Sequence, residues 1–65
     1  MLTIEKELFH GHYKANGTPM YYIEGSALND DVLPTDVENG STIKILDVTR
    51  FKVFDAENNI WRIWE

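Results

Sequence analysis

The sequence predicts an all-β fold, a small antiparallel meander of four to five strands arranged like a barrel or a sandwich. Apolar and polar residues alternate in at least four segments, which is the period of half-buried strands. Very short connections separate the last three of these segments, and strands joined in that way pair antiparallel. No segment sustains the 3.6-residue period of a helix. We expect one small β domain that spans residues 1–65.

The first two thirds of the chain predict two strands, a turn and a long connection. "LTIEKEL" alternates with a period of two and predicts the first strand. "FHGHYKANGTP" collects the Gly, Asn and Pro residues of loops, with "KANGT" as the hairpin turn. "MYYIEG" is an aromatic and β-branched run that favours a strand. "SALNDDVLPTDVENGS" is a polar connection with room for no more than one helical turn, because Pro34 and Gly40 break it.

The last third predicts a three-stranded meander of "TIKIL", "RFKVF" and "IWRIW". Side chains alternate between the two faces of a strand, so Ile43 and Ile45 share one face and Lys44 lies on the other. In the same way, Trp61 and Trp64 point in opposite directions, and each face of the last strand carries a tryptophan. Both faces of the meander are therefore apolar. The second face must be covered by the N-terminal strands, by another subunit or by both.

A chain of this length has little core to stabilise it, because about 60 residues bury only roughly 60% of the surface that the unfolded chain exposes. Small domains often depend on disulfides, a metal or a partner subunit, and the sequence contains no cysteine. We therefore expect a homo-oligomer, with a dimer as the default because two-fold pairs are the commonest symmetric assemblies. No segment has the apolar length of a membrane span, and "MLTIEKEL" lacks the features of a signal peptide. These observations predict a soluble protein made in a cytoplasm.

The charge distribution argues against nucleic acid as a partner. Eleven Asp and Glu residues outnumber six Lys and Arg residues, which gives a net charge of −5. No basic residue falls between Ala15 and Ile43, whereas five acidic residues do. Nucleic-acid-binding proteins carry clustered basic residues, so we expect no nucleic acid. One copy does offer charge complementary to the acidic loop of another, through the meander cations Lys44, Arg50, Lys52 and Arg62.

The motifs of metal binding and catalysis are weak or missing. His10 and His12 in "HGH" would project to the same side of an extended segment, a spacing that some metal sites use, with an acid such as Glu24 or Asp31 as the third ligand. Two exposed loop histidines are the simpler interpretation, and we expect no metal and no other cofactor. The sequence has no Cys nucleophile, no Gly-rich phosphate loop and no Ser in a nucleophile elbow, so we expect no enzyme activity.

The stretch "LPTDVENGSTIKILDVTRFKVFDAENNIWRIWE" resembles a group of very short proteins encoded by tailed phages and prophages of Gram-positive bacteria. The shared pattern is Pro-Thr-Asp, a Gly-Ser or Gly-Thr pair, a strand, an Asp-Thr-Gly-Lys turn, an aromatic strand ending in Asp and a terminal Trp strand. Thr49 departs from it, because the pattern has glycine there and a β-branched residue resists a positive φ. With "YYIEG", the resemblance covers about the last two-thirds of the chain. The matching residues are Pro34, Thr35, Asp36, Gly40, Ser41, Asp47, Phe51, Phe54, Asp55 and Trp61.

The resemblance implies a phage origin and a virion-associated role, since genes of this family tend to lie among virion structural genes, and it implies no catalytic residue. We therefore expect a non-enzymatic structural or accessory protein that associates with itself and binds another phage virion protein. The alternative is a phage effector that binds a host protein and blocks or sequesters a component of a host defence system. The expected location is the host bacterial cytoplasm, the virion or both.

We expect the binding surface on aromatic residues, because Trp and Tyr combine a large apolar area with one polar group and favour the centres of interfaces. Trp64 is expected at the interface ahead of Trp61, since the core of a monomer can least easily enclose the penultimate residue. The acidic loop is expected beside this surface. The predicted set is Tyr21, Tyr22, Trp61, Arg62, Trp64, Asp30, Asp31 and Asp36.

Overall fold

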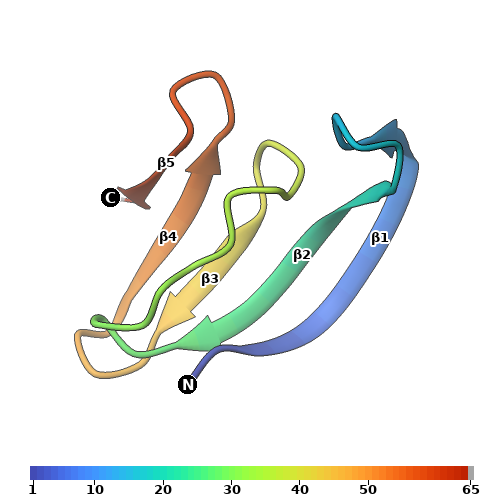
Figure 1. The fold of residues 1–65 in the computed structure, drawn as a ribbon. Coiled ribbons are helices and arrows are strands. Elements are labelled where there is room, and N and C mark those ends of the chain that lie inside the picture. The colour runs from blue at the N-terminus through green and yellow to red at the C-terminus, as the bar shows by residue number, and fades with distance from the viewer. Residues whose placement is uncertain (65) are drawn as a thin grey trace.

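The computed structural model describes residues 1–64 and arranges them as five strands of one sheet, with no helix in that range (Figure 1). The all-β class is confirmed, and every segment that the sequence predicted as a strand is one. The strands lie across the sheet in chain order. Their bounds are β1 (Thr3–Tyr13), β2 (Pro19–Ala27), β3 (Thr42–Ile45), β4 (Arg50–Asp55) and β5 (Ile60–Trp64).

The pairing of β2 with β3 is parallel, whereas the sequence predicted antiparallel strands throughout. The other three pairs are antiparallel. The physical reason lies in the segment 28–41, which leaves the end of β2, crosses one face of the sheet and returns the chain to the side of β2 (Figure 1). A parallel pair requires a crossover of roughly a dozen residues or more, and this segment provides it.

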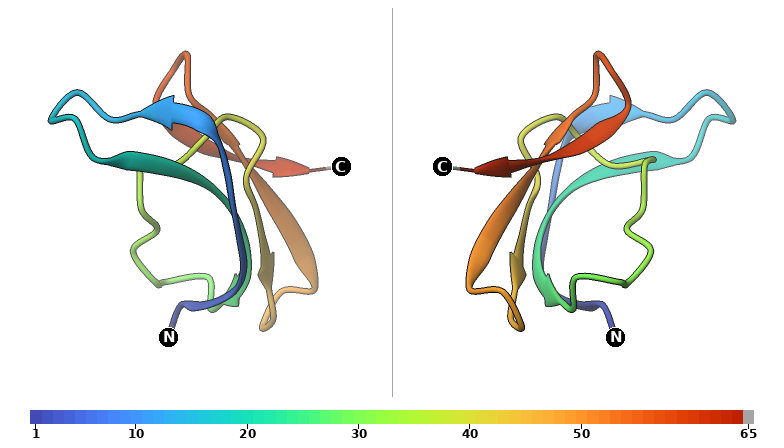
Figure 2. Two further views of the ribbon diagram at one scale, coloured as in Figure 1. Left: turned by 90° about the vertical axis from the view of Figure 1, so that its right-hand side faces the viewer. Right: turned by 90° about the vertical axis from the view of Figure 1, so that its left-hand side faces the viewer.

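The sheet is strongly curved and remains open, with β1 and β5 at its two edges (Figure 2). It is therefore not a closed barrel. The segment 28–41 lies along one side of the curve, and we call the side that it covers the inner face. The N-terminal strands extend the sheet at its edge and do not fold over the meander. Of the alternatives for covering the second face of the meander, cover by the N-terminal strands is therefore wrong.

The core lies between the inner face of the sheet and the segment 28–41. Ile43 and Ile45 are fully buried there, and Lys44 between them is exposed on the other face, as the alternation predicted. Val37 contributes from the covering segment. The full set of buried apolar residues is Ile23, Ala27, Val37, Ile43, Ile45 and Phe54, with Leu2, Leu33 and Trp61 packed against it.

The first hairpin is longer than the sequence predicted. Its turn is at "KANGT" as expected, where the N–H of Lys14 donates to the carbonyl of Thr18 at 2.8 Å and the Asn16 carboxamide accepts from Thr18. β1, however, continues through His10 and His12, which the sequence had indicated as loop residues. Both histidines therefore belong to β1, in the stretch between Phe9 and Tyr13 where its register with β2 shifts.

The hydroxyl of Ser41 joins the covering segment to the sheet. It is fully buried, donates to the carbonyl of Glu38 at 2.8 Å and accepts the N–H of Ile23 at 3.1 Å. The Ser41→Ala variant would leave a buried N–H without a partner, so we expect the free energy of unfolding to fall by about 1–3 kcal/mol. Urea denaturation measures this, with Ser26→Ala in β2 as the control. An equal effect of both substitutions would contradict the role of the Ser41 hydroxyl.

Thr49 occupies the left-handed region that its β-branched side chain disfavours, with φ at 54° in the turn from β3 to β4. A non-glycine residue in this region costs roughly 1–2 kcal/mol. We therefore expect Thr49→Gly to raise the free energy of unfolding by about 1 kcal/mol, after the greater backbone entropy of glycine is subtracted. Asn59 has φ at 55° in the next turn and is the matched control, because asparagine tolerates this region. An Asn59→Gly gain as large as that of Thr49→Gly would contradict the strain at Thr49.

Candidate binding surface

Exposed aromatic side chains form a row across the face opposite the covering segment, which we call the outer face. Lys44 is opposite Phe51 in the β3–β4 register, and Phe51 is opposite Trp64 in the β4–β5 register. Opposed residues on neighbouring strands point to the same face. Phe51 is 52% exposed and Trp64 is 65% exposed. We define the outer patch as Lys44, Leu46, Phe51, Arg62 and Trp64.

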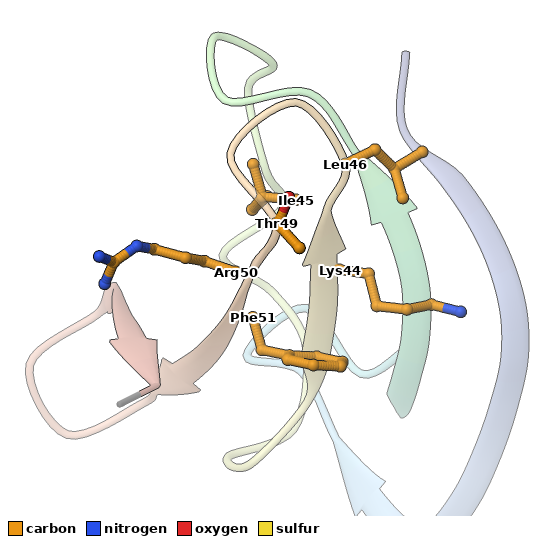
Figure 3. A pocket seen from close by; sticks show the side chains of 6 residues that line it. All are labelled: Lys44, Ile45, Leu46, Thr49, Arg50 and Phe51. Atoms are coloured by element: carbon orange, nitrogen blue, oxygen red, sulfur yellow. The ribbon is translucent and has the colours of Figure 1, made fainter.

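Two hollows lie on this patch and share Phe51. One has a volume of about 340 Å³ and is lined by Thr42, Phe51 and Trp64. The other has a volume of about 160 Å³ and lies beside the turn from β3 to β4, where Leu46 is 61% exposed. Figure 3 shows its lining, with the side chains of Lys44 and Arg50 extending in opposite directions. The larger hollow has an apolar wall formed by two aromatic rings.

Trp61 lies on the inner face, as the alternation predicted. Its ring packs on Phe54 with centroids 5.2 Å apart, and its indole N–H donates to the carbonyl of Pro34 at 2.8 Å. Pro34 belongs to the covering segment, so Trp61 holds that segment against the sheet. Trp61 is therefore partly buried against the core, while Trp64 has no such cover.

The two predicted tyrosines lie far from Trp64 in the strand order, because β3 and β4 separate β2 from β5. The ring of Tyr21 contacts that of Phe9, with centroids 6.0 Å apart. The hydroxyl of Tyr22 donates to Glu24 at 2.7 Å, and this carboxylate raises the pKa of Tyr22. Neither tyrosine lines the hollows of the outer patch.

The acidic residues of the predicted set lie in the covering segment, away from the outer patch. Asp31 accepts from the N-terminal ammonium at 2.8 Å, and this contact, with the N–H of Leu28, lowers the pKa of Asp31. Asp36 pairs with Lys14 at 2.9 Å, which lowers the pKa of Asp36. Asp30 is exposed. The structure therefore does not bring the aromatic and acidic residues of the predicted set together on one face. Strand alternation places Trp61 and Trp64 on opposite faces, and the acidic loop lies on the face of Trp61.

The cations of the outer patch have partners within the chain. Arg62 donates from Nε to Asp55 at 2.7 Å, which uses one of the five N–H donors of the guanidinium. The side-chain amide of Asn58 donates to the same carboxylate at 2.9 Å. These two donors, Asn58 first, lower the pKa of Asp55 to about 2. Lys44 lies 3.3 Å from Glu5 and is half exposed.

The low pKa of Asp55 predicts acid sensitivity of the β4–β5 turn. Because the folded pKa of about 2 lies below the ordinary value of 3.8, this contribution to stability is present above about pH 4 and is lost as the pH falls toward 2. We expect the urea midpoint to fall across this range, and to fall less in Asp55→Asn. An equal fall in the two proteins would contradict the assignment.

Both histidines contact one carboxylate, and it is not one of the acids that the sequence suggested. The Nδ1 atoms of His10 and His12 lie 3.1 and 2.9 Å from the two oxygens of Glu38, whose side chain is largely buried. Among residues 1–64, no three His, Cys, Asp or Glu side chains are placed to hold a metal ion together. The cluster therefore links β1 to the covering segment.

Comparison with protein-family models, with curated proteins and with solved structures gives no match to this chain. Within the described residues, no helix is long and apolar enough to cross a membrane.

The sequence interpretation missed Phe51 as a surface residue, although a signal for it was present. The short "DAENN" connection indicates a tight turn, and pairing Phe54 with Trp61 across it places Phe51 opposite Trp64. The two aromatic residues then occupy the same face by alternation. The exposed row could therefore have been found from the register of the turn.

Proposed function

We propose that the protein is a non-enzymatic binding module that associates with itself and docks on other proteins through the outer patch. The observation that supports this most is the row of Phe51 and Trp64, two large aromatic side chains that lie side by side and are both more than half exposed. The inner face is covered by the segment 28–41, whereas nothing within residues 1–64 covers these two rings.

Because the domain is small, covering these two side chains matters for its stability. Burying one large apolar side chain contributes roughly 1.5–3 kcal/mol, and a domain this small has a net stability of only about 5 kcal/mol. Because Phe51 and Trp64 are each a little over half exposed, covering both contributes about as much as burying one such side chain, which is a large fraction of the stability of the fold. Aromatic residues in a hollow with cations nearby are also typical of the energetically dominant centres of protein interfaces.

Sedimentation of Trp64→Lys tests this proposal. The parent protein is expected to show a mass above the 7.6 kDa of one chain, and the variant is expected to sediment as a monomer with an unchanged far-ultraviolet circular dichroism spectrum. The matched control is Tyr13→Lys, which removes an aromatic side chain of similar exposure from the distal end of β1. Association that is weakened equally by both substitutions would contradict a role for the outer patch.

We also propose that this binding serves a phage particle, as a virion structural or accessory protein. The support is the resemblance of the C-terminal two-thirds to short phage proteins, together with an exposed aromatic patch that suits docking on a larger assembly. Mass spectrometry of purified virions tests it, and several copies per particle are expected. Absence from virions, with binding to a host defence protein in the infected cell, would favour the effector alternative.

A further inference from the structure

A second apolar feature lies in the covering segment, at the tip Leu28–Val32. Val32 is 92% exposed, although valine is among the residue types most often buried. Asp30 is exposed beside it. We call this tip, with Val32 and Asp30, the acidic knob.

The knob is held in place by its own hydrogen bonds. The Asp31 carboxylate accepts from the N–H of Leu28 and from the N-terminal ammonium, both at 2.8 Å. The N–H of Asp31 donates to the carbonyl of Leu28 at 3.1 Å, and the N–H of Asn29 donates to Asp47 at 2.9 Å. A segment fixed in this way loses little conformational freedom when it binds. Val32 is therefore exposed on a segment whose conformation is fixed by hydrogen bonds.

The knob and the outer patch have matching chemistry. The patch offers an apolar hollow of about 340 Å³ between Phe51 and Trp64, which is roomy for one valine side chain. Lys44 and Arg62 are the cations of the patch, and each remains about half exposed beside its own partner, Glu5 or Asp55. Asp30 is the exposed acid two residues before Val32. Opposite charges around an apolar contact fix its register and favour one partner over others.

The two features cannot meet within one copy, because they belong to opposite sides of the sheet. The covering segment that carries the knob lies on the inner side of the sheet (Figure 2), and the hollow lies on the outer face. Building on the proposed function, we propose that the acidic knob of one copy seats in the outer patch of the next, so that the chains associate head to tail. The occupant of the hollow is then Val32 of a second copy.

This contact joins two different surfaces of the chain. Two copies can make it reciprocally, and the result is then a two-fold dimer with two knob-to-patch contacts. Where the rotation between copies does not close at two, the assembly closes into a larger ring or grows as a filament with one free knob and one free hollow at its two ends. The mass of the assembly is therefore that of two chains or more.

Complementation between two variants tests the proposal. Val32→Lys removes the knob and leaves the outer patch intact, and Trp64→Lys does the reverse. Each variant alone is expected to sediment as a monomer of 7.6 kDa, and an equal mixture is expected to form a one-to-one complex of twice that mass, since one functional contact remains. Both positions are exposed, so the fold tolerates the substitutions, and circular dichroism verifies this.

The possible outcomes separate this inference from the proposed function. If Val32→Lys assembles like the parent while Trp64→Lys does not, the outer patch binds another surface and the head-to-tail contact is overturned. If both variants are monomers and their mixture stays monomeric, the pairing of knob and patch is overturned as well. If the parent protein is itself a monomer, the proposed self-association fails together with the inference. Formation of the mixed complex supports both.

Discussion

Trp61→Ala is expected to unfold the protein, whereas Trp64→Ala is expected to leave the monomer folded and remove its assembly. Trp61 packs on Phe54 and donates to the carbonyl of Pro34, so its truncation opens the core and releases the covering segment. Truncating an aromatic side chain in a core costs about 3–5 kcal/mol. Trp61 is partly buried, and even the lower end of this range is more than half the stability of a domain this small, about 5 kcal/mol. Circular dichroism measures the first effect and sedimentation the second.

Trp61→Phe isolates the hydrogen bond within this effect. The phenyl ring retains most of the apolar contact with Phe54 but cannot donate to the carbonyl of Pro34, so a loss of about 1 kcal/mol is expected. The assignment of the two tryptophans would be wrong if Trp64→Ala unfolded the monomer, or if Trp61→Ala left its stability unchanged and altered only assembly.

Gly25→Ala is expected to remove a large part of the free energy of unfolding. Gly25 is opposite Ile4 at a point where the register of β1 and β2 shifts, and the two backbones approach closely there. A Cβ atom at position 25 would meet the carbonyl oxygen of Thr3 and lie 3.2 Å from the Cα of Ile4. Because these are backbone atoms, β1 itself must move. Inserting a methyl group into a packed site costs about 1–3 kcal/mol, occasionally more.

Gly11→Ala is the control for this substitution. Gly11 has φ at 86° with open space around its Cα, so alanine there tests backbone conformation alone, at a cost of roughly 1–2 kcal/mol. The expected order of stability in urea is therefore parent, Gly11→Ala, Gly25→Ala. A Gly25→Ala protein as stable as its parent would contradict the close approach of the β1 backbone to Gly25.

The strands of this fold are readable from the sequence because each depends on local alternation. Ile43 and Ile45 point inward and Lys44 points outward because side chains alternate along a strand, as the pattern predicted. The turn "KANGT" follows from residues that favour turns wherever they occur. The opposite directions of Trp61 and Trp64 likewise need only the period of a strand.

The parallel pairing of β2 with β3 could not be read in the same way. It depends on the segment 28–41, where Val37 is an isolated apolar residue in a polar stretch and gains its role only by packing on the sheet. Ser41 likewise resembles an ordinary turn residue, yet its buried hydroxyl accepts the N–H of Ile23. Both contacts join residues far apart in the chain, so no local pattern indicates them.

One residue of the candidate surface, Trp64, was predictable from the sequence, whereas the place of the acidic loop was not. Trp64 was expected at an interface because a small core cannot enclose both tryptophans, and it is the more exposed of the two. The acidic loop was placed beside it because charge was read from sequence position alone. In the structure that loop covers the inner face, away from the outer patch of its own chain.

Sedimentation equilibrium of the unmodified protein, from micromolar to near-millimolar concentration, tests whether another copy covers the outer patch. We expect a mass above 7.6 kDa that rises with concentration, and a return to 7.6 kDa when Trp64 is replaced by lysine. A mass of 7.6 kDa for the unmodified protein across the whole range would contradict it.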